Sequence, residues 1–305
     1  MLRALFIWLS ESKSLRAIAE KSSFGLRISL RFVAGTTVDE ALAATAAVNA
    51  QGCSVSLDSL GENVSDAEAA KRSAETYHRL LNEIAARHLE ANVSVKLTQM
   101  GLDVSDALAR GITGGIVEHA AKHDNFVRID MEGSAYTDPT LRMVHELHDI
   151  DGNAGHVGAV IQAYLYRSEK DVGELLDHGI RIRLCKGAYK EPPEIAFQKK
   201  ADVDANYVKL MKMLLKSGIY HGIATHDPKM IAATCEFARS EKIAPHAFEF
   251  QMLYGIRRDL QHQLVKEGWR MRVYIPFGAE WYPYFMRRLA ERPANVFFVL
   301  RNLLR

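Results

Sequence analysis

Cysteine is scarce in this chain of 305 residues, which contains only Cys53, Cys185 and Cys235. An odd number of thiols without CxxC spacing supports neither a disulfide framework nor a zinc ribbon, so we expect a reducing compartment. The 12 histidines form no HExxH motif and no paired metal spacing. The sequence therefore predicts no metal site.

The chain also lacks a strong net charge and a long apolar run. Its 39 Lys and Arg residues nearly balance 37 Asp and Glu residues, which leaves a net charge of +2. Such a balance supplies no global field for nucleic acid, and we expect no nucleic-acid partner. The apolar run at residues 5–9 is far shorter than the roughly 20 residues that span a membrane. No small-residue cleavage site follows it, so it does not predict a secretory signal.

The first 35 residues are basic, with six Lys and Arg residues against two Glu residues. One interpretation is an organelle transit peptide or a helix lying on a membrane surface. The other is a set of amphipathic helices packed on the main domain. We favour the packed helices and expect residues 1–50 to cover the domain that follows.

The remaining sequence repeats one pattern, a short β-branched run that ends in polar residues and leads into a helical stretch. The composition is ordinary for a globular protein, with 48% hydrophobic and 25% charged residues. The eight runs are residues 53–58, 93–97, 126–131, 158–163, 182–186, 222–225, 248–251 and 272–275.

Helix boundaries are indicated by caps between these runs. The predicted N-terminal signals are Ser65 with Glu68, Asp138-Pro139 and Asp227-Pro228, and the predicted C-terminal glycines are Gly218 and Gly268. The seven intervals from Leu57 to Ile275 average about 31 residues, which suits about 250 residues in eight βα units. We therefore predict an α/β fold, a (β/α)8 barrel over residues 51–305. An open doubly wound sheet remains the structural alternative.

The barrel prediction requires functional side chains at the carboxyl ends of the strands. Polar residues stand at or just after seven of the predicted strands. They are Lys96, Asp130, Glu132, Gln162, Tyr164, Arg183, Lys186, Thr225, His226, Gln251 and Tyr274. So many strands contributing together are hard to explain by the scaffold alone.

Several of these side chains are cationic. Lys96, Arg183 and Lys186 would face the mouth of the barrel, joined by Arg287 and Arg288 on a helix after the last strand. Such a mouth suits an anionic ligand such as a phosphate or a carboxylate. The alternative for any one of these cations is a weak salt bridge at the rim. The acidic residues expected to balance them are Asp130 and Glu132, with Glu249 and Glu291 as further candidates.

The motifs at the strand ends resemble those of the flavin-dependent proline dehydrogenases, particularly the monofunctional bacterial kind. The resemblance covers nearly the whole chain from residue 31 onward. The matching motifs are RFVAG at 31–35, VKLT at 95–98, RIDME at 128–132, QAY at 162–164, RLCKGAY at 183–189, ATH at 224–226, FEFQML at 248–253 and RRLAE at 287–291. Cys185 and Asp227 depart from the usual pattern, and neither is expected to do chemistry.

This resemblance implies a distorted barrel that binds FAD, with N-terminal helices packed on it and the last helix over the strand ends. It implies oxidation of L-proline to Δ1-pyrroline-5-carboxylate by hydride transfer to flavin N5. It also implies electron transfer to a membrane quinone and a separate pyrroline-5-carboxylate dehydrogenase. We expect a cytoplasmic protein with peripheral contact at the inner face of the membrane.

The resemblance also assigns roles to residues. Arg183, Lys96 and Asp130 would be catalytic, with Arg183 near flavin N5 and Asp130 balancing and orienting Lys96. The substrate-binding set would be Lys96, Asp130, Tyr189, Leu253, Tyr274, Tyr284, Arg287 and Arg288. The cofactor-binding set would be Gln162, Arg183, Lys186, Gly187, Ala188, Thr225, His226 and Gln251. For Tyr189, Leu253, Tyr274 and Tyr284, plain core packing is an equal alternative.

Two other functions stay open at this stage. A class I aldolase on the same barrel would use Lys96 or Lys186 as a Schiff-base nucleophile. A ligand-binding barrel without catalysis is the second alternative. A yellow protein whose colour is bleached by proline would argue against both.

Overall fold

A computed structural model describes residues 29–62 and 64–291 of the chain, with side chains in the last helix described as far as Met286. Eight parallel strands close into a barrel in the order of the sequence, and the last strand pairs with the first. The strands are β1 (Ser54–Ser59), β2 (Ala91–Val95), β3 (Val127–Ile129), β4 (Val157–Gln162), β5 (Arg181–Cys185), β6 (His221–Ala224), β7 (Phe248–Leu253) and β8 (Met271–Phe277).

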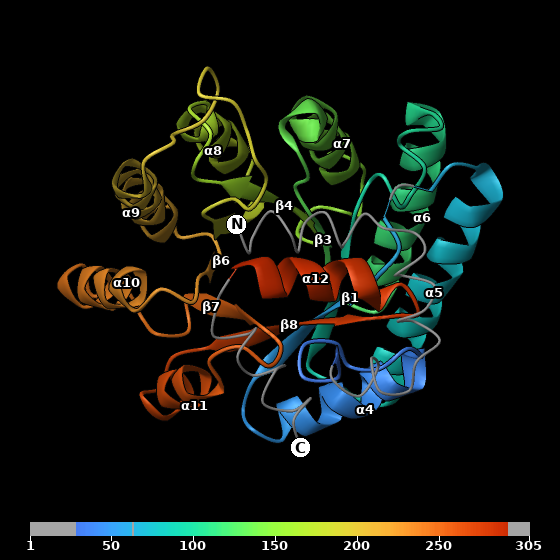
Figure 1. The fold of residues 1–305 in the computed structure, drawn as a ribbon, viewed down its shortest axis with the longest axis horizontal. Coiled ribbons are helices and arrows are strands. Elements are labelled where there is room, and N and C mark those ends of the chain that lie inside the picture. Colours follow the sequence, from blue (N-terminus) through green and yellow to red (C-terminus); the bar gives the residue numbers. More distant parts are fainter. Residues whose placement is uncertain (1–28, 63, 292–305) are drawn as a thin grey trace.

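Helices form a ring around this barrel (Figure 1). They are α4 (Val38–Asn49), α5 (Ala67–Ala86), α6 (Asp106–Lys122), α7 (Thr137–His148), α8 (Ser168–Asp177), α9 (Lys200–Lys216), α10 (Pro228–Ser240) and α11 (Arg258–Lys266). A further helix, α12 (Trp281–Glu291), is not part of the ring. The outward side chains of the strands, such as Val55, Leu57 and Val93, are fully buried against the ring. The predicted (β/α)8 barrel is confirmed, and each predicted strand overlaps an observed one. The open sheet was the wrong alternative.

Some of the predicted helix caps are correct. Asp227 is the N-cap of α10 and accepts a hydrogen bond from the backbone N–H of Lys229, with proline at the first helical position. Gly218 and Gly268 follow the ends of α9 and α11 with φ of +76° and +87°. Glycine adopts this left-handed conformation without the steric cost that other residues meet.

Two other cap predictions are wrong. The N-cap of α5 is Asp66, whose side chain accepts from the backbone N–H of Ala69, so Ser65 and Glu68 do not form the predicted box. Asp138 is not the N-cap of α7, which already begins at Thr137. The helix starts there because a 3₁₀ turn, η1 (Ser134–Tyr136), leads directly into it. Neighbouring polar residues compete for such cap positions, and the preceding backbone decides between them.

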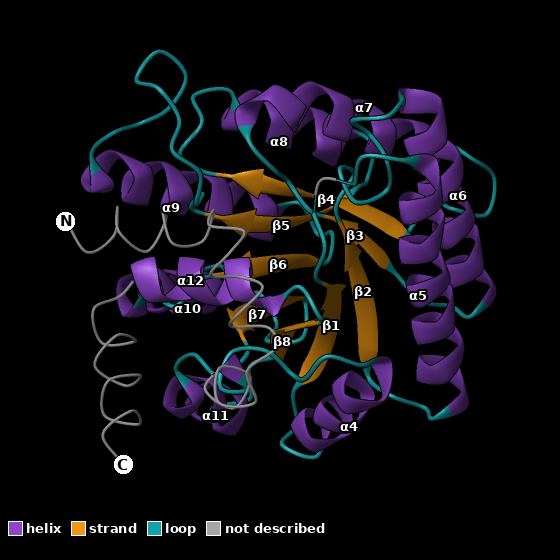
Figure 2. Ribbon diagram, turned by 45° about the vertical axis from the view of Figure 1, so that its right-hand side comes forward, coloured by secondary structure: helices purple, strands orange, loops and turns teal. Residues whose placement is uncertain are grey.

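Helix α12 lies across the middle of the ring rather than within it (Figure 1), at the ends to which β4, β5 and β6 point (Figure 2). Its buried Trp281 and Phe285 pack with Phe32, with Leu60 after β1 and with Ile256 after β7. The expected position of the last helix over the strand ends is therefore confirmed. The cluster closes one side of the barrel mouth with apolar surface.

The N-terminal part of the prediction is described only from residue 29 onward. Helix α4 packs against β1 and β8, and its N-cap Thr37 and Glu40 form a reciprocal capping box. Residues 1–28 lie outside the described part, so the division of the chain at residue 50 stays a prediction. Within the described residues, no helix has the length and apolarity to cross a membrane.

Candidate active site

The barrel interior is polar, which is unusual for a fold whose strands are normally filled by branched apolar side chains. Strand pairing places one alternating set of residues on the inside. Among them are Ser56, Asp58, Ser94, Lys96, Arg128, Asp130, Arg183, Glu249, Gln251, Arg272 and Tyr274. Buried polar groups need partners, and most of these side chains find them across the barrel.

Arg183 on β5 is the central cation of this interior. It is 6% exposed, and one guanidinium nitrogen, Nη1, donates to Asp130 Oδ1 at 2.7 Å and Ser94 Oγ at 3.0 Å. Nη2 donates to Ser56 Oγ at 3.1 Å, and Nε donates to Gln251. With three guanidinium nitrogens engaged, the charge is held in one orientation.

Space for this arrangement comes from a glycine on the next strand. A Cβ on Gly222 would lie 2.3 Å from Gln251 Nε2, closer than real contacts allow. Gln251 thus crosses the place where another residue would have a side chain. Its amide accepts from Arg183 and donates to Glu249, which in turn accepts from Arg272 Nε at 2.6 Å.

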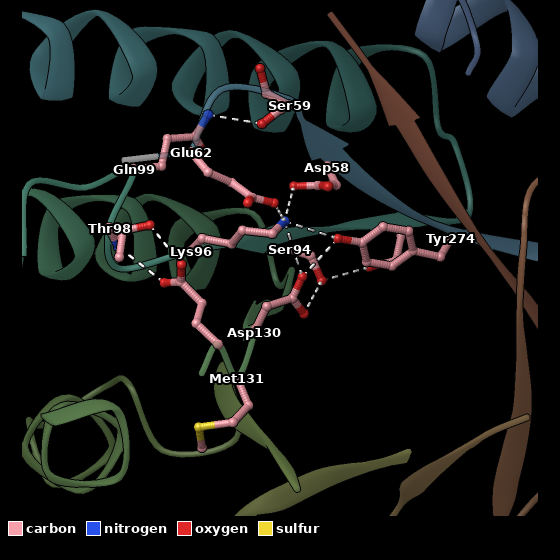
Figure 3. Close-up of polar contacts among 12 residues, drawn as sticks. Asp58, Ser59, Glu62, Ser94, Lys96, Thr98, Gln99, Asp130, Met131 and Tyr274 are labelled. Atoms are coloured by element: carbon pink, nitrogen blue, oxygen red, sulfur yellow. Dashed lines mark hydrogen bonds and ion pairs between the residues drawn. The ribbon is translucent and has the colours of Figure 1, made fainter. Parts of the chain in front are cut away.

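Lys96 directly follows the last residue of β2, and Figure 3 shows its amine between Asp58, Asp130 and Tyr274. Its Nζ donates to Asp58 Oδ1 at 2.9 Å and to Tyr274 Oη at 3.3 Å, and lies 3.6 Å from Asp130 Oδ2. Glu62 stands at 4.0 Å. Burial opposes the charge of Lys96, but Asp58, Tyr274 and Asp130 raise its pKa well above the usual value. The amine is therefore protonated.

The groups around Lys96 have shifted pKa values of their own. Burial, with Asp130 adding to it and Lys96 opposing it, raises the pKa of Asp58 to about 6. Burial and Asp130 raise the pKa of Tyr274, so its hydroxyl keeps its proton and donates to Asp130 Oδ2 at 2.7 Å. Asp130 thus accepts hydrogen bonds from Arg183 and Tyr274 while facing Lys96.

The carboxylate nearest to Lys96 was not among the residues predicted to balance the mouth. Asp58 is the last residue but one of β1, and a polar residue near a strand end is the signal that could have identified it. Glu132 instead accepts from Thr98 N at 3.1 Å and from Thr98 Oγ1 at 2.7 Å. Glu249 pairs with Arg272 at the other end of the barrel. Glu249 therefore does not balance the mouth, whereas Glu132 interacts with the charge of Lys96 without a direct ion pair. The side chain of Glu291 lies outside the described part.

Lys186 belongs to a separate cluster on the rim. It pairs with Asp204 on α9 and, at 2.8 Å, with Asp227 at the start of α10. Lys200 bridges the same two carboxylates. Burial opposes ionisation of Asp227, but hydrogen bonds from Lys186 and from the backbone of Lys229 lower its pKa to about 2. The cluster holds two cations and two anions, so the predicted anion-binding lysine already has acidic partners.

The other predicted cofactor residues surround this rim. The Oε1 atom of Gln162 is buried without a hydrogen-bond partner among the described residues. Gly187 has a φ of +108°, and a Cβ there would lie 2.3 Å from the ring of Tyr164. Ala188 follows on the same loop. The end of β4 thus offers an unused acceptor atom, and the loop after β5 offers a close approach of the backbone.

Thr225 and His226 hold the β6 end in place. Thr225 Oγ1 accepts from the backbone N–H of Asp227 at 3.1 Å, and His226 Nε2 accepts from that of Leu253 at 2.9 Å. Gln251, predicted to act with them, lies instead inside the barrel beside Arg183. Gln251 therefore contacts Arg183 and is separated from the predicted rim set.

The predicted substrate wall is only partly assembled. Tyr274 lies in the interior, while Leu253 at the end of β7 and Tyr284 on α12 belong to the apolar cluster beneath that helix. Tyr189 is 41% exposed on the loop after β5. Arg287 and Arg288 lie on α12, but their side chains are outside the described part.

Comparisons with known proteins agree on one family. A family model described as proline dehydrogenase matches residues 41–301. Proline dehydrogenase 1 of Bacillus subtilis (strain 168) is 41% identical over 306 residues, covering 100% of both chains. Proline dehydrogenase of Deinococcus radiodurans is 39% identical, covering 99% of this chain and 98% of its own.

A solved structure extends the likeness to three dimensions. Proline utilization A (PutA) from Bdellovibrio bacteriovorus, inactivated by N-propargylglycine, is 26% identical with a TM-score of 0.83. The match covers 95% of this chain and 36% of that one. This chain therefore corresponds to about a third of that larger protein.

Proposed function

The chain belongs to the proline dehydrogenase family, and we propose that it oxidises L-proline to Δ1-pyrroline-5-carboxylate, with FAD as its cofactor. The observation that carries the proposal is a cluster of charges inside the barrel, formed by the buried Asp58, Asp130 and Arg183 and the nearly buried Lys96. Burying charges is costly. A scaffold would be served better by apolar side chains, so the cluster is best explained by chemistry.

The residues at the rim fit a flavin. The unpartnered Gln162 Oε1 would accept from the N–H groups of the flavin ring, and the Gly187 backbone would approach it closely. Lys186 and Lys200 would turn from Asp204 and Asp227 toward phosphate oxygens, with Thr225 and His226 toward the adenosine half. FAD, when bound, supplies flavin N5 as the acceptor of the hydride from the ring carbon next to the proline nitrogen.

Arg183 would stabilise negative charge that develops beside it. Its orientation is set in advance by Asp130, Ser94 and Gln251, so little reorganisation accompanies the reaction. Asp130 keeps the pocket from holding unbalanced positive charge before substrate binds. The same carboxylate restrains the Tyr274 hydroxyl and, with it, the ring that borders the pocket.

Binding of the substrate carboxylate would fall to Lys96 together with Arg287 and Arg288. A planar guanidinium offers two parallel donors and fixes the angle of a carboxylate as well as its position. Asp58 and Tyr274 orient the Lys96 amine by accepting hydrogen bonds from it. Tyr274, Leu253 and Tyr284 would contact the apolar edge of the proline ring, with Tyr189 closing over it from its exposed loop.

The electrons and the product would be passed to two different partners. We assign the electrons to a membrane quinone, reached through peripheral contact of a cytoplasmic protein with the inner face of the membrane. The product would pass to a separate pyrroline-5-carboxylate dehydrogenase.

The aldolase alternative is not favoured. A Schiff-base lysine needs an unprotonated amine, whereas Asp58, Tyr274 and Asp130 outweigh burial and raise the pKa of Lys96 well above the usual value. Lys186 is likewise paired with two aspartates. Borohydride in the presence of an aldehyde should not trap either lysine.

An absorbance spectrum of the purified protein tests the proposal. We expect flavin bands between about 370 and 450 nm that bleach when L-proline is added without oxygen and return with a quinone analogue. Bands that do not respond to L-proline would leave a flavin protein with another substrate. A colourless protein that cannot be reconstituted with FAD would overturn the proposal.

A further inference from the structure

A pocket of about 480 Å³ lies at the opposite end of the barrel from the candidate active site. Its lining includes residues at the amino ends of β2, β3 and β5, together with the loop before β3. In barrels of this type the amino end usually serves stability. This pocket, however, is lined by three arginines, Arg128, Arg181 and Arg272.

Two of the three arginines have no carboxylate partner. Arg272 pairs with Glu249 at 2.6 Å, but within the described residues no carboxylate lies within 4 Å of the side chains of Arg128 or Arg181. Both guanidinium groups lie against one ring, with their Cζ atoms 4.6 and 5.2 Å from the centre of Phe126. Two unpaired cations are thus neighbours at one wall of the pocket.

Arg128 is 5% exposed, and one of its donors is unsatisfied. Its Nη1 donates to the carbonyls of Ala159 at 2.9 Å and Arg181 at 2.6 Å, whereas Nε is buried without a partner among the described residues. An unmet donor on a buried charged group is costly. Burial and the nearby Arg183 and Arg181 also lower the pKa of Arg128.

The local backbone makes room for this arginine. A Cβ on Gly158 of β4 would lie 2.3 Å from the carbonyl oxygen of Arg181 and 2.8 Å from Arg128 Nη1. Only glycine therefore allows the guanidinium to reach across β4. Asn92, also in the lining, has a buried Oδ1 without a partner among the described residues, so the wall offers more than one unused polar atom.

We propose that this pocket binds a small oxyanion, a phosphate or carboxylate group, between Arg128 and Arg181. The negative charge of such a group would balance the positive charges of both guanidinium groups. One of its oxygens would accept a hydrogen bond from the unpartnered Arg128 Nε. Glu90 and Asp124 also line the pocket. Their negative charges favour a compact anion, such as phosphate or a small carboxylate, over an extended polyanion.

The test uses the purified full-length holoprotein and calorimetric titration with inorganic phosphate and, separately, with malonate. We expect saturable binding of at least one of them at matched ionic strength. Phosphate binding alone assigns the site to phosphate groups, and malonate binding alone to carboxylates. Arg181→Gln should weaken the binding about tenfold or more, the usual effect of losing one charge-assisted contact.

The matched control is Arg239→Gln. This substitution removes the same charge as Arg181→Gln. Arg239 also lies over an aromatic ring, with its Cζ 5.7 Å from the ring centre of Trp269, but it does not line the pocket. Its variant should bind as the wild type does. Equal weakening by both variants would show that only the net charge matters and would overturn the proposal. The proposal would also be overturned if neither phosphate nor malonate bound.

Hydrogen exchange of the wild-type protein locates the anion without any substitution. Saturating phosphate or malonate should slow exchange at residues 88–92 and 123–128 and leave α12 unchanged. Protection at α12 instead would assign the anion to the candidate active site. That result would overturn the proposal even if Arg181→Gln failed to fold.

Discussion

Asp130 is the residue on which the candidate active site depends most. It accepts from Arg183 at 2.7 Å and from Tyr274 at 2.7 Å, and it stands 3.6 Å from Lys96. One carboxylate thus restrains two cations and the phenol beside them. The motif around Asp130 predicted its pairing with Lys96, but not that Lys96 would meet Asp58 first. That choice depends on the stagger of β1 against β2, which the local sequence does not encode.

Tyr274 should govern selectivity between L-proline and 4-hydroxyproline. The half-buried aromatic ring at this position would fill the space that an extra ring hydroxyl needs. Tyr274→Ser should therefore lower kcat/KM for proline and shift the preference toward hydroxyproline by about 1 to 3 kcal/mol. Steady-state kinetics with both substrates measure the ratio.

Tyr274→Phe is the matched control for this prediction. It removes the hydroxyl that contacts Asp130 and Lys96 but keeps the ring. The ratio between the two substrates should stay near that of the wild type. An unchanged ratio in Tyr274→Ser would mean that the ring does not border the substrate.

Arg287 and Arg288 offer a second prediction at this scale. Replacing either by Met should raise KM for proline about tenfold or more, because a charge-assisted contact to the carboxylate is lost. The FAD content should not change. If KM for both variants stays within about twofold of the wild-type value, the carboxylate is bound elsewhere.

At the scale of elements, His221 at the start of β6 links β6 to β5 and to the end of α9 through hydrogen bonds. Its Nδ1 accepts from the backbone N–H of Ile182 on β5 at 3.0 Å, and its Nε2 lies 3.0 Å from Ser217 Oγ at the end of α9. Both contacts suit the neutral ring. Burial, with Arg128 nearby, lowers the pKa of His221 to about 3.

This shift predicts acid sensitivity. Because the pKa falls from its usual 6.5 to about 3 on folding, the stabilisation is complete above pH 6.5 and is lost as pH falls from there toward 3. The expected slope is about 1.4 kcal/mol per pH unit. Urea unfolding at pH 7, 6 and 5 should show a shallower loss for His221→Gln than for the wild type.

The exposed His262 supplies the comparison for that measurement. His262→Gln removes a histidine that contacts Gln51 at the surface and should leave the wild-type pH dependence of unfolding unchanged. If His221→Gln retains the full wild-type slope, the acid sensitivity arises from other groups.

At the scale of the whole molecule, the fold could be predicted because the βα repeat could be recognised in the sequence. Eight βα units at a spacing of about 31 residues leave few topologies, and closure follows when β1 meets β8. The polar interior was not predicted, because alternation within a short strand does not say whether its polar side faces water or the barrel axis. Only the closed sheet turns Ser56, Arg128 and Glu249 inward together.

The mode of cofactor attachment is a property of the whole molecule, because it depends on every nucleophile near the site. A covalent flavin link needs a reactive Cys or His. Cys53 and Cys235 are buried away from the mouth, and burial raises the pKa of Cys185 to about 11, which keeps its thiol protonated. His226 uses Nε2 to accept from Leu253. We therefore predict that acid precipitation releases the FAD, and yellow colour in the pellet instead of the supernatant would show a covalent bond.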